Sequence, residues 1–147
     1  MPVSDPRVAT VFRIFGGTAA TYDEFVERAT LGLDSRWKEE IFSRMREPRR
    51  VADLASGTGI VSFEIARRWP ACRVTGVEIQ HEYFELARRR AADFGLDDRV
   101  RFVCERAEDA VLEPGGFDHV VTSYLPKYAD LPRLDSKLRS WLAPRGR

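Results

Sequence analysis

The chain has 147 residues, of which 44% are hydrophobic and 32% charged, the composition of a globular domain in water. Its formal net charge of +1 gives no long-range field for nucleic acid or anionic lipid, so neither is expected as a partner. No apolar run approaches the roughly 20 residues that span a bilayer, and two cysteines exclude a disulfide framework or a cysteine metal cluster.

The first third of the chain predicts helices. Residues 1–49 are expected to form a helical lead-in, or lid, ahead of an α/β region at 50–147, within one structural domain. The polar stretch 18–23 predicts the cap of one helix, and a second helix is expected at 35–46. The expected buried face of the second helix comprises Trp37, Ile41, Phe42 and Met45.

From Arg50 onward, apolar strand patterns alternate with helical ones. Strands are expected at 51–55, 73–79, 100–104 and 118–124. Helices are expected at 60–69, at 82–94 and from the Asp130 cap onward. The alternation predicts a doubly wound, Rossmann-like, mostly parallel sheet in the order 3-2-1-4. A cofactor would then lie where this order reverses, at the carboxyl ends of the first and fourth strands.

Three packing expectations accompany these elements. Cys72 and Cys104 stand in or beside strands and are expected to be buried, reduced thiols. The expected inner stripe of helix 82–94 comprises Phe84, Ala87, Ala91 and Phe94. The expected packing face of the last helix comprises Leu131, Leu134, Leu138 and Trp141.

The run from Val51 to Ile60 reads as a buried strand, a glycine turn and a helix start. Its turn has the form G-x-G-x-x-S, and Ser62 stands where a dinucleotide fingerprint has a third glycine. Asp53, at the cofactor end of the strand, would repel a pyrophosphate but suits the ammonium group of a methionine moiety. Glu78, at the end of the next strand, would accept hydrogen bonds from ribose hydroxyls. The pattern favours S-adenosylmethionine over NAD, and an NAD-binding Rossmann protein remains an alternative.

The segment Asp53-Leu-Ala-Ser-Gly-Thr-Gly59 together with Glu78 resembles the first two motifs of class I S-adenosylmethionine-dependent methyltransferases. The lead-in triplets Thr21–Asp23, Leu31–Leu33 and Arg36–Lys38 resemble those of the ubiquinone/menaquinone biosynthesis C-methyltransferase family. The resemblance implies methyl transfer from S-adenosyl-L-methionine to a small molecule, with a quinol-like ring as the favoured acceptor. A non-catalytic S-adenosylmethionine-binding domain is the second alternative.

The resemblance also implies a set of cofactor-binding residues. They are Tyr22, Asp53, Ala55, Ser56, Gly57, Thr58, Gly59, Glu78, Ile79, Ala107, Glu108, Thr122 and Ser123. The loop would line the methionine part, Glu78 would hold the ribose and Ile79 would pack on the adenine. Arg106 stands where the family has an aspartate, and because a guanidinium cannot accept a hydrogen bond, Glu108 or Asp109 is expected to take over the adenine contact.

The sequence does not identify the catalytic base, and His119, Tyr124 and Lys127 are candidates by location.

Strands five to seven of the usual class I methyltransferase fold are expected to be absent. The edge of the fourth strand, beside Val120 and Val121, would then be unpaired and predicts a homodimer through that side. The N-terminus has no secretion pattern, so a cytoplasmic location is expected.

Overall fold

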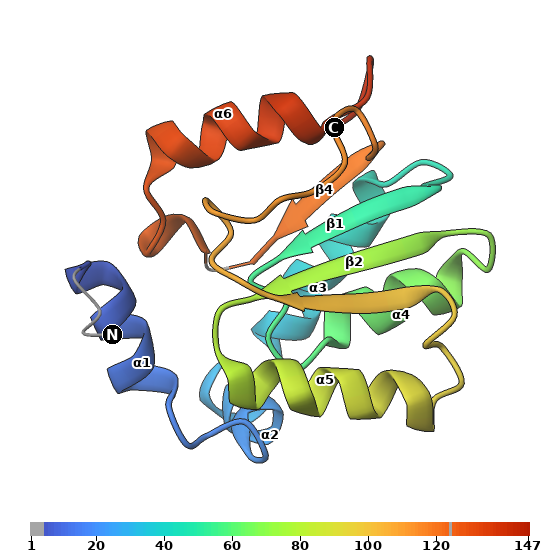
Figure 1. The fold of residues 1–147 in the computed structure, drawn as a ribbon. Coiled ribbons are helices and arrows are strands. Elements are labelled where there is room, and N and C mark those ends of the chain that lie inside the picture. The colour runs from blue at the N-terminus through green and yellow to red at the C-terminus, as the bar shows by residue number, and fades with distance from the viewer. Residues whose placement is uncertain (1–4, 124) are drawn as a thin grey trace.

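The computed structural model describes residues 5–123 and 125–147. Within them, four strands form one parallel sheet in the order β3-β2-β1-β4 (Figure 1). The strands are β1 (Arg50–Leu54), β2 (Arg73–Glu78), β3 (Val100–Cys104) and β4 (His119–Thr122). The predicted order and direction are therefore confirmed. Tyr124, expected to close the fourth strand, lies outside the described residues.

The helices divide between the sheet and its carboxyl edge. They are α1 (Pro6–Phe15), α2 (Tyr22–Ala29), α3 (Leu33–Arg44), α4 (Ile60–Arg68), α5 (His81–Asp93), a 3₁₀ turn η1 (Leu125–Lys127) and α6 (Leu131–Trp141). In Figure 1, α4 and α5 lie on one side of the sheet and α6 on the other, while α1 and α2 lie beyond the carboxyl ends of the strands. None of the helices in the described residues is long and apolar enough to cross a bilayer.

Two apolar clusters hold these layers together, because successive strand residues face opposite sides of a sheet. On the α4 and α5 side, Val51 packs with residues of α3, α4 and α5, among them Phe42 and Ile65. On the α6 side, Leu54 packs with Trp141 and its neighbours. The sheet is thus covered on both faces, as a parallel sheet requires, and only its carboxyl edge is left for α1 and α2.

Helix α1 begins with a well-formed N-terminal cap. The Asp5 side chain caps it by accepting a hydrogen bond from the Arg7 backbone N–H at 2.9 Å, and Pro6 occupies the first helical turn. Val8, Val11 and Phe15 follow at helical spacing, and all three turn toward the body of the protein, where Val8 is buried and the other two line a cavity.

Several packing expectations are wrong. Trp37 is 54% exposed, whereas Ile41, Phe42 and Met45, nearer the end of α3, pack in or against the core. Leu131 is also 54% exposed at the first turn of α6, where the helix has not yet reached the sheet. Cys104 is exposed at the end of the edge strand β3, whereas Cys72 is buried as expected.

The inner stripe of α5 also differs from the expected one. Ala87 and Ala91 are buried, but Tyr83 rather than Phe84 is the buried aromatic at the start of the helix. Phe94 is 48% exposed just past the helix end. Its ring contacts Phe63 edge-on at 5.2 Å and is covered on one face by the Arg67 guanidinium.

The outer edge of β4 is partly occupied by the end of the chain. The Val120 N–H donates to the Arg147 carbonyl at 2.7 Å, and the Arg147 N–H donates to the Asp118 carbonyl at 2.9 Å. Phe117 also forms an isolated parallel bridge with Leu142. The expectation of an unpaired edge beside Val120 is therefore wrong at that residue.

Candidate functional site

The loop between β1 and α4 adopts an unusual backbone. Ala55, Gly57 and Gly59 all have positive φ, at 56°, 56° and 86°. A non-glycine residue in this region, such as Ala55, is strained by of order 1–3 kcal/mol, and such strain concentrates at functional sites. A Cβ on Gly59 would also lie 2.7 Å from the Phe63 ring. The glycines therefore permit a turn that leaves the loop backbone facing open space.

Glu78, at the end of β2, fastens this loop. One carboxylate oxygen accepts from the Gly57 N–H at 2.8 Å and the other from the Gln80 N–H at 2.9 Å. The side chain is buried, and burial raises the pKa of Glu78 although the backbone donors act in the opposite direction. A carboxylate oxygen can accept two hydrogen bonds, so each keeps capacity for a further donor, such as a hydroxyl.

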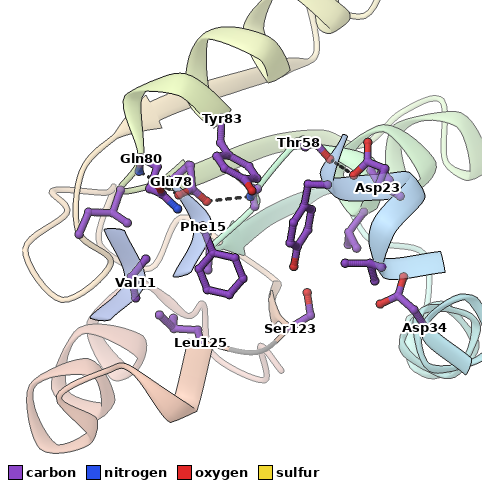
Figure 2. A pocket seen from close by; sticks show the side chains of 18 of the residues that line it. Val11, Phe15, Asp23, Asp34, Thr58, Glu78, Gln80, Tyr83, Ser123 and Leu125 are labelled. Atoms are coloured by element: carbon purple, nitrogen blue, oxygen red, sulfur yellow. Dashed lines mark hydrogen bonds between the residues drawn. The ribbon is translucent and has the colours of Figure 1, made fainter. Parts of the chain in front are cut away.

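A cavity opens between the loop and the lead-in helices (Figure 2). Its space measures about 910 Å³, counting its open mouth. Its wall comprises Val11, Phe15, Tyr22, Asp23, Val26, Asp34, Lys38, Ala55, Ser56, Gly57, Thr58, Ile60, Val61, Glu78, Ile79, Gln80, Tyr83, Ser123, Leu125 and Tyr128. Most of these side chains are apolar or aromatic, with a few charged groups among them.

A smaller cavity of about 360 Å³ adjoins the main one. The two share residues of their walls, which are Val11, Ala55, Ile79, Leu125 and Tyr128. The smaller cavity adds Ala107 and Glu108 from the segment after β3 and Val77 from β2. The two cavities are neighbours at the carboxyl edge of the sheet and are called the two lobes of the site.

The predicted site residues divide into three groups. Lining the main cavity are Tyr22, Ala55, Ser56, Gly57, Thr58, Glu78, Ile79 and Ser123. Lining the smaller cavity are Ala107 and Glu108. Lining neither are Asp53, Gly59 and Thr122. Ten of the thirteen thus line one of the two lobes, although they come from five separate stretches of sequence.

Asp53 lies beneath the loop. Its carboxylate is 1% exposed and accepts from the Ser62 hydroxyl at 2.7 Å, which ties β1 to the first turn of α4. Desolvation by burial raises the pKa of Asp53 to about 7, although the Ser62 hydrogen bond opposes the rise. Ser62 is itself fully buried. A serine at the third glycine position is thus accommodated because its hydroxyl has a buried partner.

Polar contacts fasten α2 and the segment before it over the loop and α5. Asp23 of α2 accepts from the Thr58 hydroxyl at 2.6 Å and from Arg90 of α5 at 2.7 Å. Glu82, in the first turn of α5, accepts from the backbone N–H groups of Gly17 and Ala19. These contacts join residues more than thirty positions apart and close one side of the cavity.

Arg106, which departs from the family pattern, fastens α1 to the opposite side. Its guanidinium donates to Asp5 at 2.6 Å and also pairs with the buried Glu108. Glu108 in turn accepts from the Asp130 N–H at 2.6 Å. Asp109, the other residue considered for the adenine contact, pairs instead with Arg133 and lines neither cavity.

Two hydroxyls near the loop have no internal partner. Among the described residues, the buried Oγ of Ser56 and the buried Oγ1 of Thr122 make no hydrogen bond. A buried polar atom left unpaired costs of order 1–3 kcal/mol. Ser56 lines the main cavity, but its Oγ lies beside Gly76 of β2.

The sequence interpretation missed part of the cavity wall. Asp34 and Lys38 of α3 line the main cavity, and α1 contributes Val11 and Phe15. The helical spacing of Val8, Val11 and Phe15 was a usable signal for α1. Lys38 belongs to the triplet Arg36–Lys38 that resembles the family's lead-in, whereas nothing in the local sequence distinguishes Asp34 from the charged residues beside it.

The residues considered as a catalytic base are not gathered here. His119 pairs with Asp118 at 2.8 Å, and neither it nor Lys127 lines either cavity. Tyr124 lies outside the described residues. Among residues 5–123 and 125–147, no group of three or more His, Cys, Asp and Glu side chains is placed to hold a metal ion.

A family model and individual relatives both match this chain to methyltransferases. A family model described as "Methyltransferase domain" matches residues 51–146. The chain is 31% identical over 137 residues to the demethylmenaquinone methyltransferase of Thermus thermophilus. It is 29% identical over 141 residues to the ubiquinone/menaquinone biosynthesis C-methyltransferase of Rhodopseudomonas palustris. These alignments cover 91% and 92% of this chain but only 61% and 55% of the two relatives.

Solved structures share the architecture. The geranyl diphosphate C-methyltransferase of Streptomyces coelicolor, in complex with S-adenosyl-L-homocysteine, superimposes with a TM-score of 0.70 at 24% identity, covering 76% of this chain and 42% of that one. A candidate S-adenosyl-L-methionine-dependent methyltransferase of Methanococcus maripaludis gives a TM-score of 0.74 at 20% identity, covering 87% and 59%. With the sheet order and the glycine loop, these matches establish that the chain belongs to the methyltransferase-domain family and has the class I fold.

Proposed function

We propose that the two-lobed cavity binds S-adenosylmethionine and that the chain serves in its methyl transfer to a small molecule. The observation that carries the proposal is the pairing of the buried Glu78 carboxylate with the Gly57 N–H at the cavity wall. This pairing puts a hydrogen-bond acceptor and a glycine backbone side by side at the carboxyl edge of the sheet, next to the point where the strand order reverses.

The chemistry of the wall fits such a nucleoside. Glu78 would accept from the ribose hydroxyls, and Ile79 would pack on the adenine, which would occupy the lobe bordered by Ala107. When bound, S-adenosylmethionine supplies a methyl group on a positively charged sulfur, and its release leaves the bonding electron pair on that sulfur.

The protein's own contribution would be orientation and exclusion of water. Phe15, Tyr22 and Tyr128 form an aromatic wall, with ring centroids 5.8 Å apart for Phe15 and Tyr22 and 6.1 Å apart for Phe15 and Tyr128. Holding two reactants in line can supply a large part of the rate enhancement.

For the acceptor, we propose a quinol-like ring. The support is the apolar character of the wall and the sequence similarity to proteins named for demethylmenaquinone and for ubiquinone and menaquinone biosynthesis. The test is transfer of a labelled methyl group from S-adenosylmethionine to a quinol-containing lipid extract. Label in an extractable ring compound supports the proposal, whereas donor binding without transfer to any compound in the extract favours the non-catalytic binding domain.

We also propose a cytoplasmic location and a homodimer. A cytoplasmic location agrees with the absence of a membrane-spanning helix from the described residues. A homodimer through the β4 side would use the edge beyond Val120 and is checked by light scattering at micromolar concentration, where a strict monomer would contradict it. The NAD alternative is checked by adding NADH, which should not displace S-adenosylhomocysteine.

A further inference from the structure

An oppositely charged pair lies in the wall of the main cavity. Asp34 and Lys38 are one helical turn apart on α3 and form an ion pair. Their side chains are only 9% and 20% exposed, whereas those of Glu40 and Arg44, the next such pair on the same helix, are 61% and 78% exposed. Burying an ion pair carries a desolvation penalty, and a surface pair of this spacing contributes only about 0.2–0.5 kcal/mol. Helix stability alone therefore does not account for the inner pair.

The pair lies at the far end of the cavity from the smaller lobe. In Figure 2, Val11 and Leu125, which line both lobes, lie on the same side as Glu78, while Asp34 lies on the opposite side of Ser123. With the ribose at Glu78 and the adenine in the smaller lobe, the amino-acid end of the donor would extend toward Asp34 and Lys38.

The other charged groups of the wall are already engaged. Asp23 pairs with Thr58 and Arg90, and Glu78 accepts from two backbone N–H groups. Lys38 is the only cationic side chain that lines the main cavity among the described residues. A ligand carboxylate bound in the main cavity would therefore pair with Lys38, which lies beside Asp34.

The methionine end of the donor is itself a zwitterion, with an ammonium and a carboxylate on the same carbon. A zwitterion that meets a matched ion pair brings no net charge into the site, and each charge gains a partner of opposite sign. We propose that Lys38 holds the α-carboxylate and Asp34 the α-ammonium of the donor, an inference that rests on the proposed function. Asp53, which the sequence favoured for the ammonium, lies beneath the loop and not on the cavity wall.

Two ligands separate this role from a general effect on the site. S-adenosylhomocysteine carries the amino-acid group, and 5′-methylthioadenosine has the same adenosine and sulfur without it. Calorimetric titration of the whole chain with each ligand would be done for the parent, Lys38→Met, Asp34→Asn and the exposed control Glu40→Gln. Loss of a charge-assisted contact should weaken S-adenosylhomocysteine by about 10- to 100-fold in the first two variants. Methylthioadenosine should change by less than about twofold, since it makes no such contact, and Glu40→Gln should alter neither ligand.

Asp53→Asn tests the competing assignment, in which Asp53 binds the α-ammonium of the donor. If it lowers the preference for S-adenosylhomocysteine over methylthioadenosine while Asp34→Asn does not, the ammonium belongs to Asp53 and the inference is overturned. Unchanged preference in both Lys38→Met and Asp34→Asn overturns it as well. Failure of the parent chain to bind either ligand instead refutes the proposed function itself. Retained methylthioadenosine binding also shows that each variant is folded.

Discussion

Replacing Asp53 by asparagine should change how the stability of the fold depends on pH. The burial of Asp53 raises its pKa to about 7 from an ordinary 3.8. Between these values the folded state keeps a proton that the unfolded state has lost, so the stability contributed by this group falls as the pH rises. The contribution of Asp53 to the free energy of unfolding is fully present below about pH 4 and lost above about pH 7. Asparagine keeps the shape and can still accept the Ser62 hydroxyl, but it does not titrate.

The size of the effect follows from the two pKa values. Each pH unit over which the two states differ by one proton corresponds to about 1.4 kcal/mol. Between about pH 5 and pH 7.5 the parent should therefore lose roughly 3 kcal/mol that the variant does not lose. Glu78, whose pKa is also raised by burial, contributes a loss of the same sign in both proteins, so that the difference between them reports on Asp53.

Urea unfolding followed by tryptophan fluorescence measures this difference. The free energy of unfolding of the parent minus that of Asp53→Asn should decrease steadily from about pH 5 to pH 7.5. Asp135→Asn, which removes an exposed acid of α6, is the control and should leave the pH dependence of the parent almost unchanged. A parent-minus-Asp53→Asn difference that is flat or rises with pH would refute the reasoning that this carboxyl is buried and protonated.

Two other substitutions test the loop and the attachment of α1. Gly59→Ala should lower the free energy of unfolding by about 1–3 kcal/mol, because it adds strain at positive φ and a contact with Phe63; equal urea midpoints for variant and parent would contradict this. Arg106→Ala leaves Glu108 buried without its cation and should destabilise by about 3 kcal/mol. It should also release α1 from the Asp5 contact, seen as faster proteolysis within residues 6–15, whereas Arg133→Ala, an exposed pair nearby, should leave the cleavage rate unchanged.

Local patterns were enough to predict the sheet and the glycine loop. The strand from Arg73 and the strand from Val100 follow from short apolar runs bounded by turn residues, and the loop follows from Gly57 and Gly59. The order of the first three strands then follows from general rules on crossovers, because α4 joins β1 to β2 and α5 joins β2 to β3.

What the sequence could not predict depends on contacts between distant residues. Arg106 and Asp5 are 101 positions apart, and no local pattern indicates that they pair and hold α1 over the cavity. Trp37 looked like a core residue by its chemistry, but the direction in which α3 approaches the sheet leaves it exposed. Asp34 faces the cavity for the same geometric reason, although it reads as an ordinary helix-start acid.

The proposed function depends most on a nucleoside donor held at Glu78. Calorimetric titration with S-adenosylhomocysteine tests it, with Glu78→Gln as the variant, because the amide nitrogen of glutamine cannot accept a hydrogen bond from Gly57 or from a ribose hydroxyl. The account predicts saturable binding by the parent and at least about tenfold weaker binding by the variant. Absence of binding to the parent, or equal binding by both proteins, would contradict it.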